Sequence, residues 1–157
     1  MIEFNFEYLG SFSEYDIKRI VKKAISEVLK EMDFKKKYYI SVLLTNDNGI
    51  KKINKRYRKI NKSTNVLSFP QNDERYLTKK TSKIILGDIV ISLEKIIKES
   101  KLQKKQSSDH LTHMVIHSIL HLLGFNHEKL KDFKIMKKKE INVLSKLSIS
   151  SPYAIND

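Results

Sequence analysis

The alternation of apolar and polar residues along the chain predicts four strands. A period of two is typical of a strand with one buried face, and a continuous apolar run is typical of a strand buried on both faces. The segments of these kinds are residues 2–8, 38–45, 66–69 and 84–91. Pro70 closes the third segment, because proline cannot donate to a strand ladder. Gly87 and Asp88 interrupt the fourth, so we expect a break in the middle of that strand.

Apolar residues that recur at every third or fourth position predict five helices. Ser13, Asn46 and Ser92 are candidate caps for three of them. The helices run from Ser13 to Met32, through Ile50, Ile53 and Tyr57, through Leu93, Ile96 and Ile97, from a cap at Ser107, Ser108 or Asp109, and from about Lys129 to Leu147. Among the side chains that we expect to be buried are Ile50, Ile53, Tyr57, Leu130, Phe133, Met136, Ile141 and Leu144.

The order of these elements predicts a fold class. Strands and helices interleave along the chain, so we expect one α+β domain over residues 1–157, in which about five helices pack on a small mixed sheet. Residues 71–82 are polar and predict a loop.

Four of the five histidines lie between residues 113 and 128. His117 and His121 are four residues apart, so on a helix they lie one turn apart on the same face. A glycine can take the positive φ that ends a helix and reverses the chain, so Gly124 would carry His127 back towards the same point. Two imidazoles from a helix and a third from the following turn predict one zinc ion per chain, with a fourth position open for catalysis.

The spacing of these histidines is that of the long zinc-protease motif, which makes this a zincin-like metal helix. Ser118, however, stands where a zinc protease has the glutamate that acts as general base. Peptide hydrolysis is therefore disfavoured. A phosphodiester is a better substrate, because its transition state needs a second cation more than a carboxylate base. Arg58 is the candidate for that cation, since a planar guanidinium binds phosphate through two N–H groups. The alternative is a solvated surface arginine.

Composition narrows the choice of partner and compartment. The formal net charge of +13 favours a phosphate-rich partner, although the same charge is also typical of a merely soluble surface. The chain has no cysteine, which excludes disulfides and thiolate metal ligands. The N-terminal residues lack the pattern of a signal peptide, and the longest apolar stretch, residues 84–93, contains Asp88 and is too short to span a bilayer. We expect a cytoplasmic protein that does not associate with membranes.

Several segments together carry a family resemblance. Residues 117–127 read His-Ser-Ile-Leu-His-Leu-Leu-Gly-Phe-Asn-His, residues 54–58 read Asn-Lys-Arg-Tyr-Arg, and residues 64–70 read Thr-Asn-Val-Leu-Ser-Phe-Pro. In these segments, and in residues 86–92 and 152–153, the chain resembles the YbeY family of bacterial endoribonucleases and ribosomal-RNA maturation factors.

The resemblance implies an activity and a set of site residues. It implies a single-strand-specific, zinc-dependent endoribonuclease that acts in 16S rRNA 3′-end maturation and ribosome quality control, with RNA and the small ribosomal subunit as partners. It also implies that His117, His121 and His127 bind zinc and that Arg58 is the arginine of the cleft. His113 matches a family position too: it lines the cleft, orients a metal ligand, or is a satisfied buried histidine. His110 has no such support, and we expect it at the surface.

Three positions depart from the family pattern. Ser118 replaces a glycine, a small change that a helix tolerates. Asn65 and Asn126 each replace an aspartate and so lose a negative charge, which weakens or retunes the site if either carboxylate orients a ligand or accepts a proton.

Two other functions stay open. One is a ribosome-associated RNA-binding factor in which zinc only holds the turn at Gly124. The other is a metallohydrolase that acts on peptides or esters and takes its general base from elsewhere in the chain.

Overall fold

The structure is a computed structural model that describes residues 1–71, 83–126 and 128–153. Its four strands form one mixed sheet in the order β1-β2-β4-β3, in which β1, β2 and β4 are parallel and β3 is antiparallel to β4. The strands are β1 (Ile2–Phe6), β2 (Lys37–Thr45), β3 (Val66–Pro70) and β4 (Lys83–Ser92). The helices of the described residues are α1 (Glu14–Glu31), α2 (Asp47–Arg58), α4 (Leu93–Leu102), α5 (Ser107–Leu122) and α6 (Leu130–Lys146). The predicted α+β fold with a small mixed sheet and about five helices is confirmed.

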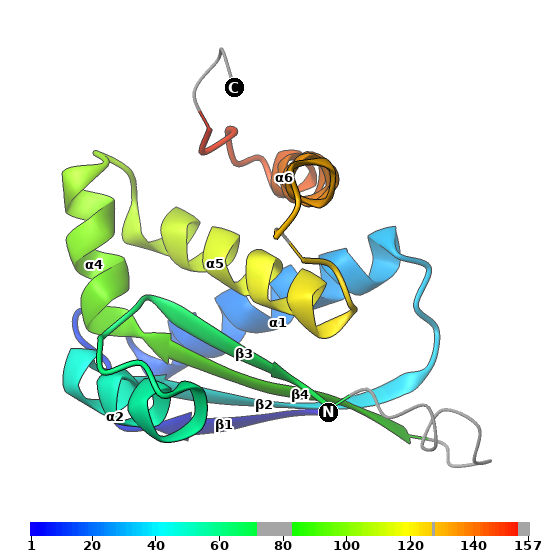
Figure 1. Ribbon diagram of the computed structural model, residues 1–157. Coiled ribbons are helices and arrows are strands. Elements are labelled where there is room, and N and C mark those ends of the chain that lie inside the picture. Colours follow the sequence, from blue (N-terminus) through cyan, green and yellow to red (C-terminus); the bar gives the residue numbers. More distant parts are fainter. Residues whose placement is uncertain (72–82, 127, 154–157) are drawn as a thin grey trace.

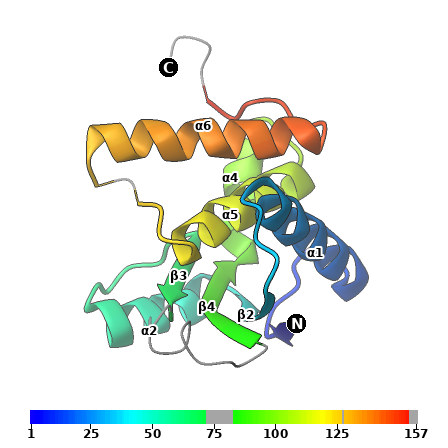
Figure 2. The same cartoon turned by 90° about the vertical axis from the view of Figure 1, so that its right-hand side faces the viewer.

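The helices form layers on the two faces of the sheet. In Figure 1, α1 and α5 cover one face and α2 lies on the opposite face. Helix α6 packs on α5 on the side away from the sheet and runs across it (Figure 2). None of the described helices combines the length and the apolar character that a membrane crossing requires.

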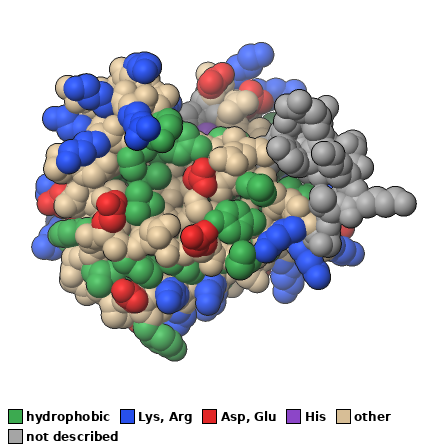
Figure 3. All heavy atoms as spheres, turned by 90° about the horizontal axis from the view of Figure 1, so that it is seen from below, with side chains coloured by type: hydrophobic (Ala, Val, Ile, Leu, Met, Phe, Trp, Pro, Cys, Tyr) green, Lys and Arg blue, Asp and Glu red, His purple; other side chains and the backbone are tan. Residues whose placement is uncertain are grey.

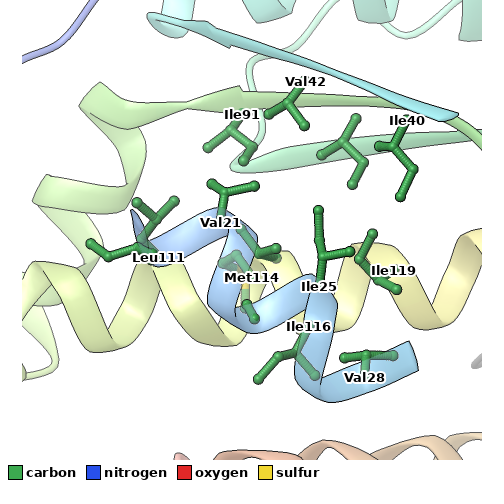
Figure 4. Packing of buried hydrophobic residues seen from close by; sticks show 14 of the residues in the cluster. Val21, Ile25, Val28, Ile40, Val42, Ile91, Leu111, Met114, Ile116 and Ile119 are labelled. Atoms are coloured by element: carbon green, nitrogen blue, oxygen red, sulfur yellow. The ribbon is translucent and has the colours of Figure 1, made fainter. Parts of the chain in front are cut away.

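The core lies between the sheet and the pair α1 and α5. Figure 4 shows Val21 and Ile25 of α1 and Ile119 of α5 pointing towards Ile40 and Val42 of the sheet. These five side chains are fully buried. Burial of each such aliphatic side chain stabilises the fold by roughly 1.5–3 kcal/mol before the entropy of ordering is subtracted. The apolar stripe of α5 therefore holds this helix against the sheet, and its remaining face is left to carry polar side chains.

Three of the predicted caps are confirmed. Ser13, Asn46 and Ser92 each accept a backbone N–H three residues further on, at distances of 3.1, 2.9 and 3.2 Å. The prediction of a side-chain cap for α5 is wrong. The capping position of α5 is Gln106, which makes no such bond, and Ser107 already lies inside the helix and bonds to another hydroxyl.

The expected break in the fourth strand is also wrong, because β4 continues through Gly87 to Ser92. Tyr39 of β2 pairs with Ile85 and the next residue of β2 pairs with Gly87, so Leu86 is an extra residue that forms a β-bulge. Gly87 has a φ of 143°, and a Cβ atom there would lie 2.3 Å from the carbonyl oxygen of Phe69 on β3. The glycine thus permits the close approach of β3 to β4.

Three side chains expected in the core are exposed. Tyr57 is 63%, Leu130 71% and Phe133 40% exposed. Helix α6 packs through its middle and end, where Met136 and Leu144 are buried, so its first turn reaches solvent. The last turn of α2 likewise carries Tyr57 to the rim of the sheet. The loop predicted at residues 71–82 lies, except for its first residue, outside the described residues.

Candidate active site

Helix α5 brings two of the predicted metal ligands together. His117 and His121 lie one turn apart, and their Nε2 atoms are 3.1 Å from each other. Two nitrogens bound to one tetrahedral zinc at about 2.0–2.1 Å would lie about 3.3–3.4 Å apart, so this pair fits a shared ion. His127, the third predicted ligand, lies outside the described residues. Within residues 1–71, 83–126 and 128–153, no three His, Cys, Asp or Glu side chains are arranged to hold a metal.

Gly124 ends α5, the helix that carries two of the predicted metal ligands, as the sequence predicts. Its φ is 102°, and its N–H donates to the His121 carbonyl at 3.0 Å while the N–H of Phe125 donates to the Leu120 carbonyl at 3.0 Å. These two bonds form a Schellman motif, which satisfies carbonyls at the end of a helix and reverses the chain. The reversal begins three residues after His121, at the place where the sequence requires it for a third ligand.

Arg58 opens onto the same cavity as the two histidines. The cavity measures about 700 Å³, and its lining includes Arg58, His117 and His121, together with Tyr57 and Tyr153. Arg58 comes from the end of α2, while the histidines come from α5. The structure therefore brings three of the four predicted site residues to one cleft.

A short polar network holds the chain just after Arg58. Lys59 takes a left-handed conformation with a φ of 61°, which ends α2, and the N–H of Ile60 donates to the Asn54 carbonyl at 3.3 Å. Asn54 is buried, and its Nδ2 donates to the Lys62 carbonyl at 2.9 Å. The asparagine of the Asn-Lys-Arg-Tyr-Arg segment thus fixes the loop that follows the arginine.

Glu140 of α6 is a site residue that the sequence analysis missed. It is 1% exposed, and it lies against three side chains of the cleft. The His117 Nδ1 is 2.5 Å from Oε1, the His113 Nε2 is 3.0 Å from Oε2, and the Tyr153 hydroxyl also donates to Oε2. A signal for this residue was present, because Glu140 falls in register with Met136, Val143 and Leu144 on the buried stripe of α6.

The three contacts keep Glu140 ionised. Burial alone would raise the pKa of this carboxyl, but the hydrogen bonds from His113, His117 and Tyr153 outweigh it and lower the pKa to about 2. Burial and the same contact raise the pKa of the Tyr153 hydroxyl, so that it stays protonated and donates. A buried carboxylate with three donors is a fixed negative charge beside the histidine pair.

The structure separates the two remaining histidines of α5. His113 lines the cleft, as one of its expected roles requires, and its Nε2 contacts Glu140. It is 7% exposed, but its Nδ1 has no hydrogen-bond partner among the described residues, so it is not a fully satisfied buried histidine. The prediction of a surface position for His110 is wrong. It is 3% exposed, and its Nε2 is 3.0 Å from Glu99 of α4. The packing of α4 against α5 covers it, which a one-helix pattern does not reveal.

Asn65 and Asn126, which replace aspartates of the family pattern, both line the cleft. The Asn65 Nδ2 donates to Glu99 at 3.1 Å and its Oδ1 accepts the Val66 N–H at 2.7 Å. An aspartate in place of Asn65 would set a second carboxylate against Glu99. The amide therefore suits its surroundings in this chain, and the lost charge is exchanged for a hydrogen bond.

Comparison with known proteins identifies the family. The model of the family described as Endoribonuclease YbeY matches residues 3–148. The chain belongs to this family. The endoribonuclease YbeY of Ruthia magnifica subsp. Calyptogena magnifica is 42% identical over 144 residues, which are 92% of this chain and 93% of that protein. The endoribonuclease YbeY of Ehrlichia chaffeensis is 39% identical over 155 residues, which are 98% of this chain and 97% of that protein.

Membership in this family confirms two predictions from the sequence, the YbeY resemblance and the enzyme class, a hydrolase that cleaves RNA internally. A solved structure is also similar: the solution structure of TM1509 from Thermotoga maritima has a TM-score of 0.58 and 24% identity and covers 94% of this chain and 92% of that one. At this identity the likeness shows the fold alone.

Proposed function

We propose that the cleft between α2 and α5 is the active site of a zinc-dependent endoribonuclease that cuts single-stranded RNA. His117, His121 and His127 hold one zinc ion per chain, and Arg58 is the catalytic cation. The observation that carries the proposal is the meeting of Arg58 with the His117 and His121 pair around one cavity.

The protein's own groups divide the work at the scissile phosphate. Zinc, when bound, supplies Lewis-acid chemistry to the phosphodiester. The Arg58 guanidinium donates N–H bonds to the non-bridging oxygens, where negative charge grows in the transition state. The nucleophile is either water or the ribose 2′-hydroxyl, and a 2′,3′-cyclic phosphate on the product identifies the ribose.

Exposed aromatic and basic groups beside the cleft support single-stranded RNA as the substrate. Tyr57 lines the cavity with 63% of its surface exposed, and its ring rests edge-on against Phe69 with 5.9 Å between centroids. An unpaired base can stack on such a ring, whereas a paired base is held in its duplex. Basic side chains gather at the left of the face in Figure 3, the side on which Figure 1 shows α2. Those of α2 and the residue after it are Lys51, Lys52, Lys55, Arg56, Arg58 and Lys59.

The finer function that we propose is maturation of the 3′ end of 16S rRNA and ribosome quality control, in the cytoplasm and in contact with the small ribosomal subunit. The match to the endoribonuclease YbeY family over residues 3–148 supports it. Cells depleted of the protein should accumulate 16S precursors with extended 3′ ends. The wild type should restore the mature end and Arg58→Ala should not; restoration by both would exclude the role of the cleft.

Cleavage of a labelled single-stranded RNA in defined zinc tests the activity directly. Arg58→Ala should lower the rate by about 10²-fold or more, as loss of one preorganised donor does. His117→Ala should abolish cleavage because it removes a metal ligand. Arg19→Ala is the matched control, since Arg19 lies on α1, pairs with Asp16 and does not line the cleft; it should cleave at the wild-type rate.

Two results would overturn this reading. Cleavage that persists in both Arg58→Ala and His117→Ala would point to a contaminating nuclease. Binding of RNA by the wild type without any cleavage would favour the RNA-binding factor with a structural zinc.

A further inference from the structure

We propose that Glu140 is a positioning residue for the metal centre: its buried carboxylate holds the His117 ring so that Nε2, and not Nδ1, presents a lone pair to the metal. The inference rests on the proposed metal site. It concerns a residue of α6, an element that contributes none of the predicted ligands.

The first step of the argument is the direction of the hydrogen bond. An ionised carboxylate only accepts, so each ring nitrogen that contacts it must carry a proton. The 2.5 Å contact between the His117 Nδ1 and the Glu140 Oε1 therefore assigns the proton to Nδ1. With the proton on Nδ1, Nε2 is the ring nitrogen that can present a lone pair to a metal. That atom faces the Nε2 of His121 at 3.1 Å, where a shared ion fits.

The second step is the rigidity of Glu140 itself. Its two oxygens have separate partners: Oε1 contacts His117, while Oε2 contacts the His113 Nε2 at 3.0 Å and accepts the Tyr153 hydroxyl. With 1% of the residue exposed, water does not compete for these positions. Rotation of the carboxylate away from His117 would break bonds on both oxygens, so the ring is held from behind.

The third step is the effect on affinity. An imidazole that binds zinc through Nε2 needs one tautomer and one orientation, and a carboxylate on Nδ1 supplies both and makes Nε2 more basic. Glu140 also joins α6 to α5 at this point, so the metal helix and the last helix share one polar contact. His113 and Tyr153 both contact Glu140 and so help to hold its carboxylate against His117.

The zinc dissociation constant of Glu140→Gln, measured by chelator competition, tests the inference. The amide keeps the shape and loses the charge, and we expect affinity to fall by about tenfold or more. Glu99→Gln is the matched control, because Glu99 makes the same kind of contact with a buried histidine of α5, His110, outside the proposed ligand set. It should leave zinc affinity within about twofold of the wild type.

A second measurement needs neither zinc nor a variant. Nitrogen-correlated NMR of the histidine rings in the metal-free wild type should show a proton on the Nδ1 of His117, the atom that contacts Glu140. This readout keeps the inference testable if Glu140→Gln does not fold, which circular dichroism would reveal.

The outcomes separate this inference from the proposed function. Tight zinc binding in the wild type and equally tight binding in Glu140→Gln would overturn the role of Glu140 and leave the enzyme proposal standing. A His117 ring that carries a proton on Nε2 and none on Nδ1 would overturn it as well. Failure of the wild type to bind zinc would instead overturn the proposed metal site.

Discussion

The chemistry of the cleft depends on single atoms of a few residues. The sequence predicts His117, His121 and Arg58, because their spacing and motif are local properties of the chain. Glu140 escaped that analysis although it lies on an apolar stripe, because its partners come from another helix and from the C-terminal segment. His110 was misplaced for the same reason: the side chain that satisfies it belongs to α4. Local spacing can propose a ligand, whereas the group that orients the ligand is set by tertiary packing.

Ser118 offers a prediction about stability. It is fully buried, and its Oγ has no hydrogen-bond partner among the residues that the structure describes. Ser118→Ala should raise the free energy of unfolding by about 1 kcal/mol, since an unsatisfied buried hydroxyl costs about 1–3 kcal/mol. Urea denaturation measures the change. Ser145→Ala, at an exposed position of α6, gives the contribution of helix propensity alone. No gain beyond that control would mean that Ser118 is satisfied.

Tyr57 offers a prediction about substrate binding. If an unpaired base stacks on its exposed ring, Tyr57→Ala should raise the KM for single-stranded RNA by about 5- to 150-fold, the equivalent of 1–3 kcal/mol for one stacked base. Tyr57→Phe should restore the wild-type KM, because it keeps the ring. Tyr15→Ala removes a tyrosine of α1 that is even more exposed than Tyr57, and it should leave the KM unchanged. An unchanged KM in Tyr57→Ala would show that no base stacks on this ring.

At the scale of secondary-structure elements, the sequence predicts where helices and strands occur better than it predicts strand irregularities or which parts of a helix are covered. The caps at Ser13, Asn46 and Ser92 could be predicted because an N-cap bond spans only three residues. The bulge in β4 could not, since Leu86 is extra only relative to its partner strand β2. The exposed first turn of α6 was missed because a helical period indicates an apolar face and not what covers it.

Two glycines provide a matched prediction at this scale. Gly87 and Gly124 both have positive φ, but a Cβ on Gly87 would clash with the Phe69 carbonyl, while a Cβ on Gly124 meets nothing within 4 Å. Gly124→Ala should therefore cost only backbone strain, about 1–2 kcal/mol. Gly87→Ala should cost at least about 2 kcal/mol more, because β3 must move away from β4. The free energy of unfolding of each metal-free variant is measured by urea denaturation. Equal losses in the two variants would show that β3 can move away from β4 at no cost.

At the scale of the whole molecule, the cleft is assembled from the end of α2, from β3, from α5 and from the C-terminal segment. The interleaving of strands and helices is enough to predict the fold class. It does not predict which helix and strand ends come together at the cleft, because that depends on the strand order, in which β4 lies between β2 and β3. The family resemblance predicts that Arg58 and the histidines belong to one site. The cavity that they share is seen only in the folded chain.

Metal binding should be visible in the stability of the whole chain. A ligand that binds only the native state stabilises it by about 2.7 kcal/mol when its free concentration is 100 times its dissociation constant. The midpoint of thermal unfolding should therefore rise when zinc is added to the metal-free protein, and fall again with a chelator. His121→Ala should show no such rise. An equal rise in this variant would assign the stabilising zinc to a different site.

The zinc content per chain tests the central claim most directly. Elemental mass spectrometry of the purified wild type should find one zinc ion per chain. The same measurement on His121→Ala should find that the zinc is lost, because we propose that the two α5 imidazoles share the ion. A His121→Ala protein that keeps one zinc per chain, or a wild type that cleaves RNA while holding no metal, would contradict the account.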